Sequence, residues 1–256
     1  MDIARAVVGG SCGVLVHVDR LRHLPIAKRL LTLGQWGAAL DRIEVDPLEE
    51  VRRVFVTSPR IDDTARSATI IELGFEDPTR VRQSLRSAGS PTEKGAVLTV
   101  DGARFAVETP APSSLVIVPE ASAEELASHK RFLREGACLP EPADDEVLYG
   151  FAESPARTLG DSLPWPDSIR DVHSRLAISP WGATLDVVAT STSEAQAEKD
   201  AETLTAALES RMRVDLVVLQ WSIMPWGEFE ARGDRVVLSA QLDRTELEIL
   251  LALGSL

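Results

Sequence analysis

The stretch VLTVDGARFAVE (residues 97–108) decides the fold class. Two runs rich in β-branched and aromatic residues flank Asp101-Gly102, and a type I′ turn needs positive φ at both of its central residues. The stretch therefore predicts an antiparallel hairpin. Neighbouring strand pairs of the same kind are predicted elsewhere in the chain, at 51–57 with 68–75, 169–178 with 184–190, and 228–231 with 235–241.

Helix signals follow these pairs. Asp77-Pro78 starts a helix that Gly89 ends, and Ser193 with Gln196 forms a capping box for a helix that reaches about Met212. Further helices are predicted at 26–33, at 36–43, from the turn at Asp46-Pro47, from Ser122 with Glu125 to about Leu133, and after Asp243 with Glu246. Residues 214–221 fit either a strand or a continuation of the preceding helix. The pattern predicts an α+β fold, mainly antiparallel sheet with helices on one face.

The chain is predicted to consist of two related α+β halves. Residues 1–135 form the N-terminal half, 136–146 a linker with two prolines and an acidic run, and 147–256 the C-terminal half. An internal duplication is one explanation for the similar order of strands and helices. The other is that β-β-α units recur in α+β proteins.

Three pairs of short sequence features support the duplication. Val14-Leu15 matches Val147-Leu148, Ser58-Pro59 matches Ser179-Pro180, and the turn at Asp101-Gly102 matches the turn at Gly233-Asp234. The number of residues between the two members differs from one pair to the next. The matches therefore depend on the order of the features along the chain more than on sequence identity.

Composition excludes several classes of protein. The 256 residues are 44% hydrophobic and 26% charged, as in a globular protein, and they contain no run long enough for a transmembrane helix. The net charge of −13 argues against binding to nucleic acid or to an anionic membrane. Residues 1–135 carry 18 basic and 19 acidic residues, and residues 136–256 carry 9 and 21. The acidic second half either keeps the protein soluble or attracts a basic protein partner.

The second half also holds most of the tryptophans. Trp181 and Trp226 each lie in a Pro-Trp-Gly sequence at a predicted turn, and Trp165 lies in a proline-flanked loop. Such residues either form a partner-binding patch or cover the end of the sheet. The sequence-level prediction is a patch made by Trp181, Trp226 and Trp165.

Cysteine content allows one disulfide. Cys12 and Cys138 are too few for a disulfide-stapled scaffold, but the two pair if the protein is exported and the chain brings them together. Residues 1–12 do not form a signal peptide. Export with the targeting segment removed and a cytoplasmic location both stay open on these grounds.

No residue set in the sequence predicts catalysis. Residues 9–13 fit the letters G-x-S-x-G, but a strand follows the serine where a nucleophile elbow needs a helix. His17, Asp19 and His23 lack a known metal-ligand spacing, and His173 stands alone in the sequence. We therefore expect no catalytic residues, no metal and no cofactor.

Three stretches carry a resemblance to known proteins: VLVHVDRLRHLPIAKRLL (14–31), DPLEEVRRVFVTSP (46–59) and ATIIELGF (68–75). With the polar loop before the third stretch, they resemble a group of uncharacterised exported or lipid-anchored myxobacterial proteins. The resemblance implies export from the cytoplasm and carries no known activity. The expected function is a non-enzymatic exported binding or assembly component, periplasmic or on the outer surface, that acts through protein–protein contacts. The alternative is an enzyme whose catalytic residues meet only in the fold.

Overall fold

The structure is a computed structural model that describes residues 10–23, 36–74, 78–93, 95–111, 113–124, 145–160, 163–179, 182–216, 219–222, 227–243 and 245–246, with the backbone alone for those between 211 and 222. The chain divides into two compact units. The first comprises Met1–Pro59 and Asp63–Ala143, and the second comprises Arg60–Asp62 and Asp144–Gly254.

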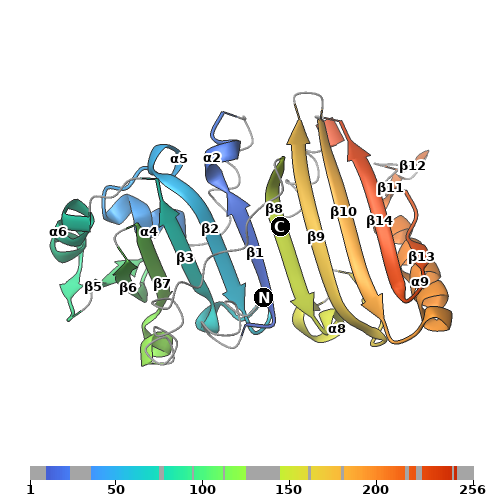
Figure 1. Cartoon of the computed structure of the whole chain (residues 1–256), viewed down its shortest axis with the longest axis horizontal. Coiled ribbons are helices and arrows are strands. Elements are labelled where there is room, and N and C mark those ends of the chain that lie inside the picture. The colour runs from blue at the N-terminus through green and yellow to red at the C-terminus, as the bar shows by residue number, and fades with distance from the viewer. Residues whose placement is uncertain are drawn as a thin grey trace. The chain divides into compact units, whose positions relative to one another are not determined.

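The first unit is built on an antiparallel sheet with the strand order β1-β2-β3-β7-β6-β5-β4 (Figure 1). Its strands are β1 (Cys12–His17), β2 (Val51–Ser58), β3 (Ala68–Leu73), β4 (Ser90–Pro91), β5 (Gly95–Val100), β6 (Ala103–Ala111) and β7 (Ser114–Pro119). Its helices are α2 (Val18–Leu21), α4 (Trp36–Arg42), α5 (Pro47–Glu50) and α6 (Pro78–Ala88), with short 3₁₀ turns at Thr64–Arg66 and Glu120–Ser122.

Local sequence signals explain several of these elements. Asp101 and Gly102 have φ values of 48° and 83°, which confirms the predicted type I′ hairpin between β5 and β6. Asp46 caps α5, because its Oδ1 accepts hydrogen bonds from the backbone N–H groups of Leu48 (2.8 Å) and Glu49 (3.3 Å).

The core of the first unit lies between the sheet and helices α4 and α6. Leu40 of α4 and Leu85 of α6 are fully buried, and both helices pack on β5. The sheet contributes Val54, Ile71 and Leu115, which are directly opposite one another on β2, β3 and β7. The helices cover this apolar row, as expected for a sheet with helices on one face.

The second unit has a smaller antiparallel sheet with the order β8-β9-β10-β14-β13. Its strands are β8 (Glu146–Glu153), β9 (Ile169–Ser179), β10 (Gly182–Ser191), β13 (Glu230–Arg232) and β14 (Arg235–Leu242), and its helices are α8 (Pro155–Thr158) and α9 (Glu194–Met212). A separate hairpin pairs β11 (Arg213–Leu216) with β12 (Leu219–Ser222), so the ambiguous stretch 214–221 is strand rather than helix. The structure confirms the α+β class and its antiparallel sheets.

The two units share an order of pairing. In each, the first three strands form a meander, a helix follows, and the last strand pairs with the third: β7 with β3, and β14 with β10. Val14-Leu15 and Val147-Leu148 fall in corresponding strands, β1 and β8. The third matched pair does not correspond, because Asp101-Gly102 joins β5 to β6 whereas Gly233-Asp234 joins β13 to β14. The duplication stays a prediction.

Several helix predictions fall wholly or partly outside the described residues. Ser122 is buried, and its Oγ donates to the carbonyl of Ala65. This hydrogen bond links Ser122 to the 3₁₀ turn at Thr64–Arg66. Of the histidine–aspartate group considered as metal ligands, His17 is the last residue of β1 and Asp19 belongs to α2. The predicted helix at 26–33 falls outside the described residues, as does most of the helix predicted from Ser122 to about Leu133 and of the last helix after Asp243.

Candidate functional site

The sheet of the second unit has one face covered by α9 and an opposite face that carries polar side chains. Ala197, Ala201 and Leu204 of α9 are buried, and the helix contacts β10, β13 and β14. Along β9, Val172 and Leu176 are buried. Asp171, His173 and Arg175 alternate with them; the first two are partly exposed and Arg175 is exposed. We call the face opposite α9 the outer face.

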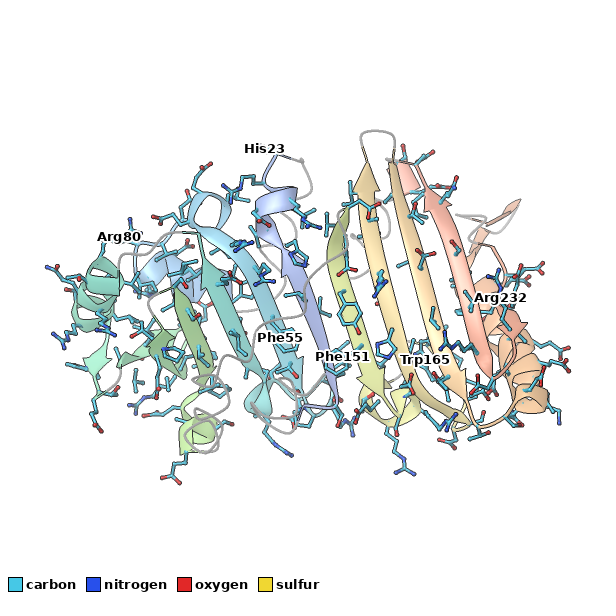
Figure 2. The ribbon with its side chains drawn as sticks, in the orientation of Figure 1. His23, Phe55, Arg80, Phe151, Trp165 and Arg232 are labelled. Carbon is cyan, nitrogen blue, oxygen red and sulfur yellow. The ribbon has the colours of Figure 1, made fainter. Side chains whose placement is uncertain are left out.

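Strand register arranges the outer face in three rows that cross β8, β9, β10 and β14. The rows are Tyr149–Arg175–Asp186–Ser239, Phe151–His173–Val188–Val237 and Glu153–Asp171–Thr190–Arg235. Figure 2 labels Phe151 on β8. The middle row is mostly apolar and the two flanking rows are polar or charged.

A connected set of side chains occupies the β8–β9–β10 part of this face. The Tyr149 hydroxyl lies 2.8 Å from Nδ1 of His173, and the two rings stack with centroids 6.0 Å apart. Nε2 of His173 lies 3.5 Å from Oδ1 of Asp171, which accepts a hydrogen bond of 2.9 Å from Thr190 Oγ1. His173 is 28% exposed and Asp171 34%, so both can be reached from solvent.

Arg175 extends the set, because its guanidinium lies over the tyrosine ring. Its guanidinium carbon is 5.9 Å from the Tyr149 ring centroid, and its Nε is 3.4 Å from Oε2 of the buried Glu146. Burial is the largest effect on the Tyr149 hydroxyl and raises its pKa, so the phenol is neutral at neutral pH. Tyr149 and Arg175 are the residue types that most often anchor protein interfaces.

A second polar cluster of the same unit is buried under the sheet. Asp200 of α9 is 1% exposed. Its Oδ1 accepts hydrogen bonds from Ser168 Oγ (2.6 Å) and Gln196 Nε2 (2.9 Å), and its Oδ2 accepts one from Ser191 Oγ (2.6 Å). The carboxylate thus joins the loop before β9, the end of β10 and the first turns of α9, which is a structural role.

The first unit also contains a polar row on adjacent strands, made by the buried His17 and Arg53 and the partly exposed Glu72. Arg53 is ion-paired with Glu72. His17 is 1% exposed, and its Nε2 has no hydrogen-bond partner among the described residues. Burial, followed by the positive charges of Arg20 and Arg53, lowers the pKa of His17 to about 4.

The structure describes only part of each sequence-predicted site. Trp165 is half-buried in the loop before β9 (Figure 2), where its backbone N–H donates to the Leu163 carbonyl. Trp181 and Trp226 lie outside the described residues, and the predicted patch stays a prediction. Cys12 is buried and its Sγ lies 3.3 Å from the Ser58 carbonyl oxygen, whereas Cys138 lies outside the described residues, so the disulfide stays a prediction as well.

Sequence reasoning missed the Tyr149–His173–Asp171 set. The spacing Asp171-x-His173-x-Arg175 on a predicted strand places three functional side chains on one face, and this was the available signal. Across the described ranges, no three His, Cys, Asp or Glu side chains gather at a point that suits a metal ion. The described helices include none that is long and apolar enough to cross a membrane.

Comparison with solved structures identifies a similar fold. Crystal form I of TP0453 is 10% identical with a TM-score of 0.58, and the match covers 98% of this chain and 96% of that chain. Crystal form IV is 13% identical with a TM-score of 0.55, again over 98% of this chain and 96% of that chain. No protein-family model and no curated protein matches the chain. At this identity the likeness defines the fold alone.

Proposed function

We propose that this protein is an exported, non-enzymatic binding or assembly component that contacts a protein partner through the outer face of its second unit. One observation carries the proposal: an ordered tyrosine, histidine and arginine lie on the sheet face opposite α9, partly exposed and fixed by one another. Residues that are already fixed lose little conformational entropy when a partner binds.

The partner is expected to be basic. The second half of the sequence, residues 136–256, holds 9 basic and 21 acidic residues. On the outer face, Glu153, Asp171 and Asp186 contribute acidic groups. Arg175, which is paired with Glu146, and the exposed Arg235 contribute basic ones. An acidic field of this kind speeds the encounter with a basic partner and makes binding sensitive to salt.

The tryptophan patch and the exported location belong to the same proposal. Trp165, Trp181 and Trp226 would add aromatic contact area to the surface of the second unit. Export to the periplasm or outer surface rests on the resemblance to the myxobacterial group. Fractionation of native cells tests it, because recovery of the protein in the cytoplasmic fraction alone would reject export.

Site-specific photo-crosslinking tests the partner surface. A photoreactive residue at Asp186 or Ser239, both exposed on the outer face, is expected to capture one discrete protein from native extract. The same group at Glu198 or Thr203, exposed on α9, serves as the matched control and should not capture that protein. Raising the salt concentration should weaken capture at the outer face. Equal capture from both surfaces would reject the proposal.

The alternative is an enzyme, and the geometry of Tyr149, His173 and Asp171 is the observation that favours it. A histidine held between a hydroxyl and a carboxylate is an arrangement suited to general acid–base catalysis. A hydrolase screen of the wild type beside His173→Ala separates the two functions. An activity that the wild type has and the variant lacks would favour the enzyme.

A further inference from the structure

Asp171 and His173 bring a carboxylate oxygen and a ring nitrogen close together. Nε2 of His173 and Oδ1 of Asp171 are 3.5 Å apart, which is longer than the 2.7–3.2 Å of an ordinary N–H···O hydrogen bond. Zinc binds imidazole nitrogen and carboxylate oxygen at about 2.1 Å. Two atoms 3.5 Å apart at that bond length subtend about 113° at the metal, close to a tetrahedral angle.

The groups around these two atoms are those that support a metal ligand. Metal-binding histidines usually use their other ring nitrogen to hydrogen-bond a neighbouring group, which fixes the ring and its tautomer. Here Tyr149 Oη lies 2.8 Å from Nδ1 of His173, and a proton on Nδ1 leaves the lone pair of Nε2 directed to the Asp171 side. Thr190 Oγ1 holds the carboxylate in the same way, by its 2.9 Å bond to Oδ1 of Asp171.

The neighbouring charges permit a cation. The basic side chains around the pair have acidic or aromatic partners or lie further along the row: Arg175 lies over Tyr149 and pairs with the buried Glu146, and Arg170 pairs with Asp234. Arg235 lies on β14, directly opposite Thr190. Glu153 lies directly opposite Asp171 on β8 and adds negative charge beside the pair. Both proposed ligands are about one-third exposed, so an ion can enter and water can complete its coordination.

We propose that Asp171 and His173 bind a divalent cation of the zinc type, with Tyr149 and Thr190 positioning the two ligands. Two protein ligands leave two tetrahedral positions for water, and such a site is weaker than a three- or four-ligand site. Nitrogen–oxygen donor sets of this kind prefer zinc, copper or nickel to magnesium or calcium.

Calorimetric titration of the full chain with Zn²⁺, in excess Mg²⁺ to occupy carboxylate-only sites, tests the proposal. We expect one zinc per chain at this site. Affinity should fall at least 10-fold in His173→Ala and in Asp171→Asn, and about 10- to 100-fold in Tyr149→Phe, which removes the group that orients His173. His23→Ala, which removes an exposed histidine of the first unit, is the matched control and should bind as the wild type does.

A second measurement uses the wild-type chain, so its result does not depend on whether the variants fold. Paramagnetic Co²⁺ added to the wild-type chain should broaden the amide resonances around Asp171 and His173 before others, and its visible absorption should be that of a tetrahedral ion. Equal zinc affinity in wild type and folded His173→Ala, or broadening that begins elsewhere, would overturn the proposal. Photo-crosslinking in the presence of EDTA tests the partner surface independently of the metal.

Discussion

Acidification is expected to destabilise the first unit through His17. The pKa of this buried histidine is about 4 in the folded chain and 6.5 in the unfolded chain. As the pH falls from 6.5 to 4, the unfolded state binds a proton that the folded state does not, so the free energy of unfolding decreases. Each pKa unit corresponds to about 1.4 kcal/mol, and with allowance for solvent screening the loss is about 2–3 kcal/mol, complete below pH 4.

Urea unfolding at pH 7.5 and at pH 4 measures this effect. His17→Phe replaces the ring by one that does not titrate, and it should lose about 2–3 kcal/mol less between the two pH values than the wild type does. His23→Gln removes an exposed histidine and should keep the wild-type pH dependence. The same pH dependence in His17→Phe and wild type would show that the buried imidazole does not couple to folding.

Replacement of Asp200 is expected to destabilise the second unit by about 3–5 kcal/mol. Asp200→Ala removes an acceptor from three donors at once. The buried hydroxyl of Ser191 and the half-buried hydroxyl of Ser168 then lack this partner. An unsatisfied buried donor costs about 1–3 kcal/mol. Chemical denaturation followed by far-UV circular dichroism gives the free energy of unfolding.

Two comparisons make the Asp200 prediction specific. Glu198→Ala lies on the exposed side of the same helix and should change stability by no more than about 0.5 kcal/mol. The double variant Asp200→Ala/Ser191→Ala should lose less than the sum of the two single losses, since the two residues share a hydrogen bond. Strict additivity would show that the bond does not hold α9 to the end of β10.

Local signals in the sequence predict the hairpins and helix starts because their causes are local. The turn at Asp101-Gly102 depends on two φ angles, and both have the required sign. The capping box at Asp243 and Glu246 is formed in both directions, with N–H···O distances of 2.8 and 2.9 Å. At Ser193 only half of the box forms, because the Gln196 side chain donates to the buried Asp200 instead.

The candidate site could not be predicted because it depends on register between distant segments. Tyr149 meets His173 only when β8 and β9 pair with Tyr149 opposite Arg175, and a long connection separates the two strands. Ser168, Ser191 and Asp200 come together for the same reason. The alternation Asp171-x-His173-x-Arg175 does indicate a functional strand face, but it does not say which residues lie across from it.

The most direct test of the partner surface compares how tightly two charge-matched variants bind the partner protein that photo-crosslinking captures. Asp186→Lys/Ser239→Arg alters the outer face, and Glu198→Lys/Thr203→Arg makes the same change of charge on α9; all four positions are exposed. Binding measured at fixed salt should weaken at least 10-fold in the outer-face variant and stay at the wild-type level in the α9 variant. An equal loss in both, or a loss only in the α9 variant, would contradict the assignment of binding to the outer face.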